Sequence, residues 1–259
     1  MNSASKITII TDSASDMPGN LHNQVTVLPM TISFGDEQFE DGVTLSADEF
    51  YMKLIESDTL PKTSQVSPFA FTSAYETALT HSDAVIVITL SSKLSGTYQI
   101  LIEYALKLIN DGLSATAIAD ELNSAKKRIR LVALLDTLEY LKKGGRISSS
   151  AAFLGNVLKI KPVIAIDNGE VAILGKARGS KQGNNFLIEQ VNTYGGIDYS
   201  MPVLLGYTGC STELIDKYIK DSSSLWENKI PVPARIKVGA TIGTHIGPGG
   251  ITVAFFSTK

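Results

Sequence analysis

Short apolar runs rich in β-branched residues alternate along this chain with segments whose apolar residues repeat at helical spacing. The runs predict strands at residues 7–11, 25–34, 85–89, 130–135, 163–166, 203–207, 236–238 and 251–256. The helical spacing predicts helices at residues 46–56, 68–80, 97–109, 115–127, 180–194 and 211–220. Because strands and helices follow one another in this way, the pattern favours an α/β fold.

Two of these helices carry signals that mark their first turn. Ser46 and Glu49 have the spacing of a capping box, in which each side chain accepts a hydrogen bond from the backbone N–H of the other residue. Ser67 stands directly before Pro68, and a proline at the first helical position has no N–H to leave unpaired. Both signals support helices at these places.

Composition sets the size of the core. The chain has 259 residues, of which 44% are hydrophobic and 19% are charged, which is enough apolar material for one large or two modest domains. No low-complexity linker divides it, and the pattern changes near Lys126. We therefore expect an N-terminal α/β domain at residues 1–126 and a C-terminal α/β domain at residues 127–259.

Charge and residue usage exclude several classes of protein. A net charge of −3 gives no basic surface for nucleic acid. The single Cys210 excludes an intramolecular disulfide, and three histidines leave little from which to build a metal site, so neither a metal nor a cofactor is expected. No apolar run reaches the roughly 18 residues of a membrane span. Residues 1–8 lack the pattern of a secretory signal, and the expected location is the cytoplasm.

Polar side chains gather where predicted strands give way to helices. Asp12 and Ser13 follow the first strand, at the carboxyl end where α/β sheets commonly place ligands. An Asx turn would explain the same two residues. Thr63 and Ser64 precede a capped helix, and such hydroxyl-rich turns are suited to anions.

A second hydroxyl-rich loop contains Ser95, Gly96 and Thr97, and its glycine permits close approach of the backbone to a ligand. Neither hydroxyl-rich loop has a Lys or Arg at its tip, and the chain has no GxxxxGK[ST] phosphate loop. A single carboxylate held by neutral donors therefore fits these loops better than a nucleotide triphosphate. His245 stands among glycines before the last strand, with room to reach a ligand, although a lone histidine is more often a core residue.

Six motifs stand in order along the chain: Thr11-Asp12-Ser13, Thr63-Ser64-Gln65, Leu94-Ser95-Gly96-Thr97, Leu141-Lys-Lys-Gly-Gly-Arg146-Ile147, Lys159-Ile-Lys-Pro162 and Gly243-Thr-His245-Ile-Gly-Pro-Gly249. The series closely resembles the DegV family and covers nearly the whole chain. This resemblance implies a two-domain α/β fold with a lipid-binding tunnel between the domains. It further implies the role of the fatty-acid-binding (FakB-type) subunit of a bacterial fatty acid kinase, which is a lipid-binding protein and not itself an enzyme.

The resemblance also implies roles for individual residues. Thr63 and Ser95 would bond the carboxylate of a long-chain fatty acid, with His245 nearby. A separate ATP-binding kinase subunit would phosphorylate that carboxylate, and Arg146 and Arg178 are the candidates for contacting it. Each arginine has an ordinary alternative, a helix end for Arg146 and an exposed surface for Arg178. This role is compatible with transient contact between the protein and a membrane surface, and no nucleic acid is expected as a partner.

One part of the chain departs from the family's pattern. Members of the family usually continue after the Ser-Gly-Thr-Tyr helix into a further strand and helix, whereas here Gln99 runs directly into Ile100 and the residues of a later helix. About thirty residues are therefore absent by comparison. If the junction is continuous, one helix should run from Thr97 to about Ile109, and the first sheet should hold one strand fewer than usual.

Two other functions remain open at this point. A hydrolase could use Ser95 as nucleophile and His245 as base, with Asp12 orienting the histidine, although the chain has no GxSxG elbow. A binding module for another small carboxylate or phosphate would need the same hydroxyl-rich loops. These loops do not encode the length of a ligand's chain.

Overall fold

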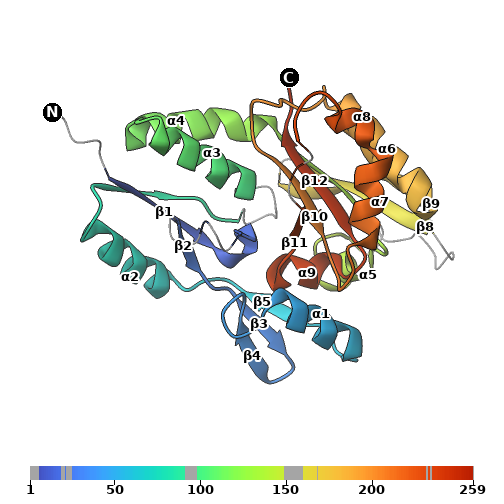
Figure 1. Cartoon of the computed structure of the whole chain (residues 1–259). Coiled ribbons are helices and arrows are strands. Elements are labelled where there is room, and N and C mark those ends of the chain that lie inside the picture. The colour runs from blue at the N-terminus through green and yellow to red at the C-terminus, as the bar shows by residue number, and fades with distance from the viewer. Residues whose placement is uncertain are drawn as a thin grey trace.

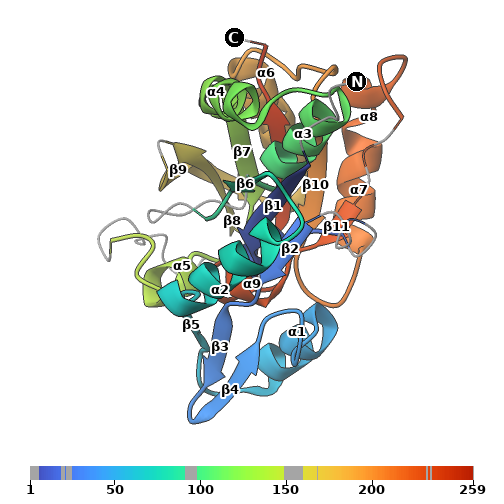
Figure 2. The same ribbon diagram turned by 90° about the vertical axis from the view of Figure 1, so that its left-hand side faces the viewer.

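The protein forms two lobes with a small hairpin unit at their base (Figure 1 and Figure 2). The structure is a computed structural model and describes residues 6–18, 21, 25–90, 98–148, 160–167, 169–231, 233 and 235–258. Among these residues, no helix is long and apolar enough to cross a membrane. The mixture of helices and sheets confirms the α/β class expected from the sequence.

The N-terminal lobe is built on a parallel three-stranded sheet in which the order of strands is β2-β1-β6. Its strands are β1 (Ile7–Asp12), β2 (Val25–Leu28) and β6 (Ala84–Val87). Its helices are α2 (Pro68–Leu79), α3 (Tyr98–Asn110) and α4 (Ala115–Ala125). In Figure 1, α3 and α4 lie above this sheet and α2 lies below it. The two faces of the sheet are thus covered by helices.

The hairpin unit contains the antiparallel sheet β4-β3-β5 and one helix. Its elements are β3 (Thr31–Phe34), β4 (Glu37–Glu40), β5 (Lys62–Ser64) and α1 (Ala47–Glu56). Buried Phe50 and Leu54 of α1 pack on Ile32 and Phe34 of β3. The capping box of α1 is confirmed, because Ser46 Oγ accepts from the backbone N–H of Glu49 and Glu49 returns the bond.

The C-terminal lobe is built on a six-stranded sheet with the order β11-β10-β12-β7-β8-β9. Its strands are β7 (Ile129–Leu134), β8 (Ile160–Asp167), β9 (Glu170–Arg178), β10 (Val203–Tyr207), β11 (Arg235–Lys237) and β12 (Ile251–Phe256). Helices α6 (Gly179–Thr193), α7 (Glu213–Asp221) and α8 (Ser223–Trp226) lie on its outer side (Figure 1). Strand β10 is parallel to β11, and the other pairs are antiparallel.

The inner face of this sheet shares a core with the N-terminal lobe. Successive residues of β7 alternate between two clusters, because side chains of a strand point to opposite faces. Val132 belongs to the outer cluster with α6 and α7, whereas Leu131 and Ala133 belong to the inner cluster with Ile9 of β1 and Ile100 of α3. One continuous apolar core therefore joins the lobes.

The sequence boundary near Lys126 falls in a short 3-10 helix (Lys126–Arg128) between α4 and β7. The described strands of the six-stranded sheet all follow it, and the other described strands all precede it. Because the core crosses the boundary, the division into residues 1–126 and 127–259 stays a prediction about domains.

Several expected elements differ from the observed ones. The single strand expected at residues 25–34 is wrong, because β2 and β3 belong to different sheets. Pro29 stands between them, and a proline has no N–H to continue a strand ladder. The sequence patterns also missed six elements, namely β4, β5, β9, α8, α5 (Glu139–Lys143) and α9 (Ala240–Ile246).

The junction at Gln99 and Ile100 lies inside one helix. Helix α3 begins at Tyr98 and runs to Asn110 without interruption, which confirms the expected continuity across the junction. Buried Ile100 and Ile102 lie in the inner core, so the residues beyond the junction pack as part of the same helix. The expected loss of one strand relative to the family stays a prediction.

Candidate functional site

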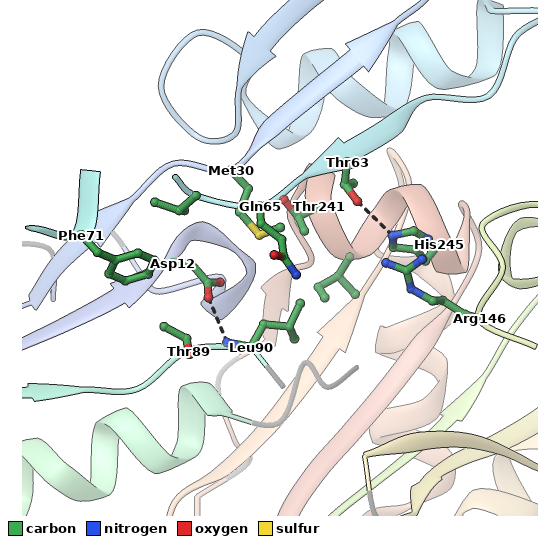
Figure 3. A pocket seen from close by; sticks show the side chains of 12 residues that line it. Asp12, Met30, Thr63, Gln65, Phe71, Thr89, Leu90, Arg146, Thr241 and His245 are labelled. Atoms are coloured by element: carbon green, nitrogen blue, oxygen red, sulfur yellow. Dashed lines mark hydrogen bonds between the residues drawn. The ribbon is translucent and has the colours of Figure 1, made fainter. Parts of the chain in front are cut away.

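A polar cavity of about 370 Å³ lies where the N-terminal lobe, the hairpin unit and helix α9 meet. Figure 3 shows the side chains that line it. These are Asp12, Met30, Thr63, Gln65, Val66, Phe71, Thr89, Leu90, Arg146, Thr241, Ile242 and His245. The volume is within the usual range for small-molecule sites.

Two side chains predicted from the sequence meet in this cavity. Thr63 comes from β5 and His245 from α9, and Thr63 Oγ1 lies 3.3 Å from His245 Nε2. His245 is only 6% exposed. Its Nδ1 finds no hydrogen-bond partner among the described residues, so the imidazole is held mainly by packing and by Thr63.

The ring of His245 lies against the turn that follows α5. A Cβ added to Gly144 would meet His245 Nδ1 at 2.4 Å, so only glycine allows this close approach. Arg146 follows in the same turn and donates from its guanidinium to the carbonyl oxygen of Gly144 over 2.7 Å. Figure 3 shows the guanidinium beside the imidazole. The site thus holds a cation next to its neutral donors.

The surroundings keep His245 neutral. Burial and the nearby positive charge of Arg146 lower the pKa of His245 to about 4. At neutral pH the imidazole therefore carries one N–H, which can be donated to a ligand from one ring nitrogen. A bound carboxylate would favour the charged ring and raise this pKa.

This lowered pKa predicts a pH-dependent contribution to stability. Between the ordinary histidine pKa of about 6.5 and the folded value near 4, the unfolded chain binds a proton that the folded protein does not. The free energy of unfolding should therefore fall as the pH drops through this interval, by about 2 to 3 kcal/mol in all, and should be unaffected by His245 above it.

The matched measurement compares the wild type with His245→Leu in urea between pH 7.5 and 4. Asp16 and Asp41 act in the opposite direction, since burial raises their folded pKa values and protonation then favours the folded state. Their contribution is common to both proteins and cancels in the difference. Parallel pH curves for the two proteins would contradict the account of His245.

Asp12 lines the cavity but is already engaged by its own lobe. Its carboxylate accepts hydrogen bonds from the backbone N–H groups of Ala14 and Leu90, at 3.1 and 2.9 Å, and from the hydroxyl of Tyr98. These bonds tie the end of β1 to the segment after β6 and to the start of α3. Asp12 therefore shapes the wall of the cavity more than it offers a free group to a ligand.

Asp41 holds helix α9 in place. Its buried carboxylate accepts from the backbone N–H groups of Ala240 and Thr241, at 3.2 and 3.1 Å, and from the Thr241 hydroxyl at 2.5 Å. Ser13 donates to the same carboxylate over 3.1 Å. The hairpin unit, the end of β1 and α9 are thus joined at one residue, and α9 carries His245 to the cavity.

A second, apolar cavity lies between the inner face of the six-stranded sheet, α9 and the start of α3. It measures about 40 Å³, close to the space of a single water molecule. Its lining consists of Asp16, Gln99, Leu131, Ala133, Leu141, Ile164, Ile166, Val171, Leu204, Ile236, Val238, Ile242, Ile246 and Thr252. Ile242 of α9 borders both cavities, so the polar and apolar spaces adjoin.

The remaining site predictions fall in different places. Ser64 is exposed and Ser13 is engaged with Asp41, and neither lines the polar cavity. Ser95, Gly96 and Thr97 lie outside the described residues. Arg178 is exposed at the end of β9, where its backbone N–H donates to Gln182, away from both linings.

Sequence reasoning missed several lining residues. Gln65 and Thr241 supply polar groups, whereas Met30 and Phe71 supply apolar surface. Gln65 adjoins the Thr63 motif, so its place could have been inferred. Thr241 gave no signal, because its segment was not recognised as a helix.

The groups required for a hydrolytic relay are not joined. Asp12 bonds Ala14, Leu90 and Tyr98, and no described residue bonds His245 Nδ1, where an orienting carboxylate would have to lie. The described geometry therefore gives no support to the hydrolase alternative.

Comparison with known proteins gives one consistent result. The family model described as "Uncharacterised protein, DegV family" matches residues 6–103 and 99–258. A DegV domain-containing protein from Caldanaerobacter subterraneus is 30% identical over 286 residues, covering 98% of this chain and 99% of the relative. The two matched stretches overlap at residues 99–103, where the order of motifs breaks.

Solved structures resemble this fold over nearly its whole length. A DegV family protein from Thermus thermophilus, described as binding fatty acid, is 26% identical, with a TM-score of 0.86, and the match covers 97% of this chain and 99% of that one. The Streptococcus pneumoniae fatty acid kinase B3 protein, loaded with linoleic acid, has a TM-score of 0.83 at 18% identity, covering 97% and 99%. The second likeness is one of fold alone.

Proposed function

Because this chain belongs to the DegV family, we propose that it binds one long-chain fatty acid, with the carboxylate in the polar cavity and the acyl chain in the apolar cavity. The observation that carries the proposal is the adjacency of these two spaces across Ile242. A fatty acid has one small polar end and a long apolar chain. The polar cavity matches the first and the adjoining apolar cavity matches the second. The relative from Thermus thermophilus is described as binding fatty acid.

The polar end of the ligand needs donors that replace water. A carboxylate in an enclosed site is costly unless it is hydrogen-bonded, and hydroxyl and imidazole groups meet that need. Thr63 and His245 supply these two groups side by side. Ser95 adds a further hydroxyl in this proposal.

The acyl chain supplies the driving force. Burying a methylene contributes about 0.8 kcal/mol, so a chain of about fourteen methylenes contributes roughly 11 kcal/mol against several lost on association. A cavity of about 40 Å³ is much smaller than such a chain. We infer that the side chains of Ile242 and Ile246, which line this cavity from α9, shift to make room when the chain enters.

The finer proposal is that the bound carboxylate is presented to a separate ATP-dependent kinase subunit. A carboxylate oxygen would attack the γ-phosphorus of ATP, forming an acyl phosphate as the bond to the bridging oxygen breaks and ADP leaves. This chain has no phosphate loop of its own, which is why the nucleotide must come with the partner. Arg146, exposed beside the polar cavity, and Arg178 are the proposed docking residues.

The test measures binding and phosphorylation separately. Native mass spectrometry of the purified protein should find one fatty acid per chain, and addition of the kinase subunit with ATP should convert it to acyl phosphate. Arg146→Ala should slow acyl phosphate formation by about tenfold or more, because a docking arginine often dominates an interface. Its effect on fatty acid affinity should be only a few-fold, since an exposed cation contributes little.

Lys142→Ala is the matched control, because Lys142 is an exposed cation of α5 that lines neither cavity. It should leave both binding and phosphorylation unchanged. Arg178→Ala should follow Arg146→Ala if both arginines contact the partner. Equal losses of binding and phosphorylation in Arg146→Ala would instead place this residue with the lipid. If the protein neither copurifies with a fatty acid nor binds an added one, the proposal is rejected as a whole.

A further inference from the structure

One buried polar side chain in the lining of the apolar cavity has an amide oxygen without a hydrogen-bond partner among the described residues. Gln99, in the first turn of α3, is 1% exposed. Its Nε2 donates to Glu103 Oε1 over 3.1 Å, one helical turn further along. Its Oε1 finds no hydrogen-bond partner among the described residues, although this side chain lines the cavity.

The orientation of the amide follows from its neighbour. A carboxylate can accept but not donate, so the NH₂ group of Gln99 faces Glu103 and the carbonyl oxygen is left for the cavity. A buried carbonyl oxygen without a donor destabilises the fold, because it gives up its bond to water and receives nothing in return. The position would suit an apolar residue better unless a donor arrives from a ligand.

The same cavity contains a second polar edge. Asp16 lines it, and one of its oxygens accepts from the backbone N–H of Gly239 over 2.8 Å. Burial and the nearby Asp41 raise the pKa of Asp16 well above its usual range. Thr252 adds a hydroxyl to the lining. The cavity thus offers several polar groups within a largely apolar wall.

We propose that Gln99 adapts the apolar cavity to acyl chains that carry a hydroxyl group away from the carboxyl end, with the Gln99 carbonyl oxygen accepting the hydrogen bond from that hydroxyl. The inference rests on the proposed function, because it assumes that the acyl chain occupies this cavity. A hydroxyl is the fitting group because it is neutral and small, and it donates one hydrogen bond while accepting others. An anionic group would find no cation among the described residues of this lining.

The experiment compares the affinities of octadecanoic acid with those of 10-hydroxyoctadecanoic and 12-hydroxyoctadecanoic acid for the full-length protein. The measured quantity is the ratio of the affinity for a hydroxylated acid to the affinity for octadecanoic acid. For at least one hydroxylated acid, this ratio should be higher in the wild type than in Gln99→Leu and Gln99→Met. The change in this ratio should be about threefold to tenfold, as expected for one hydrogen bond between neutral groups. Octadecanoic acid itself should bind the variants as well as the wild type or better, because they remove an unpaired polar atom.

The two variants guard against a folding defect, since leucine and methionine fill the space of the glutamine with different shapes, and circular dichroism establishes that each is folded. If the ratio of affinities is the same in wild type and both variants, the carbonyl oxygen is bonded to water and the inference is overturned while fatty acid binding stands. If the wild type binds none of the three acids, the proposed function fails and this inference fails with it.

Discussion

Replacing Thr63 with Val or His245 with Leu is expected to weaken the binding of a long-chain fatty acid by about tenfold to a hundredfold each. A hydrogen bond to a charged group contributes about 1.5 to 3 kcal/mol, and each change removes one donor from the carboxylate. The double variant should lose at least as much as the stronger single one. It should lose less than the product of the two effects, because the side chains lie 3.3 Å apart and act as a pair.

A glycine substitution tests the same site without removing a donor. Gly144→Ala places a Cβ 2.4 Å from His245 Nδ1, so the ring must leave the position in which it meets Thr63. Gly145→Ala is the matched control, because its added Cβ meets nothing within 4 Å, although its φ of +69° makes alanine strained. Titration calorimetry at neutral pH should show weaker binding in Gly144→Ala only. Equal binding in the wild type and Gly144→Ala would remove His245 from the carboxylate site.

Replacing Asp41 with Ala is expected to destabilise the protein by about 2 to 4 kcal/mol, since four donors would lose their acceptor in a buried place. Helix α9 begins at these donors, so the change should also weaken fatty acid binding by displacing His245. The loss of stability is measured by urea unfolding at neutral pH. Asp41→Asn should lose less, because its amide oxygen still accepts.

Asp36→Ala provides the control for this change. Asp36 is an exposed acid in the turn between β3 and β4, and its removal should alter the free energy of unfolding by less than about 0.5 kcal/mol. If Asp41→Ala and Asp36→Ala unfold at the same urea concentration, the carboxylate of Asp41 does not hold the three segments together.

The sequence predicted best those elements that local rules decide. Strands β10 and β12 were placed at their observed ends, because apolar residues fill most of each strand and proline, glycine or hydroxyl-bearing residues bound them. Helix α1 was fixed by its capping box, which needs only Ser46 and Glu49. Nothing from the rest of the fold was required to recognise these segments.

The missed elements depend on contacts across the chain. Helix α9 contains Gly243 and two β-branched threonines, which are weak helix formers, and its first N–H groups are held by Asp41 from the hairpin unit. Strand β4 consists mainly of Glu and Gln, whose strand character comes from pairing with β3. No rule that reads neighbouring residues could have found either of them.

The sequence predicted only part of the candidate site, because the site joins residues that are far apart in the chain. Residue types and their order pointed to Thr63 and His245, but their meeting joins positions 182 residues apart. The motif around Arg146 likewise did not predict that its guanidinium lies beside the imidazole of His245, because the same motif also suits a helix end. The unpaired carbonyl oxygen of Gln99 results from the packing of α3 against α9 and the six-stranded sheet, so no local pattern could indicate it.

The attachment of the hairpin unit to α9 has a consequence for the synthesis of the protein. The bonds from Asp41 to Thr241 span 200 residues, and Tyr51 donates to the carbonyl oxygen of Val238 across 187. Contacts so distant in the chain form late, and the ribosome releases the N-terminal part first. The hairpin unit is therefore synthesised long before the donors of α9, and its bonds to them form only after α9 has left the ribosome. A nascent chain therefore has no complete ligand site until α9, which carries His245, has been made.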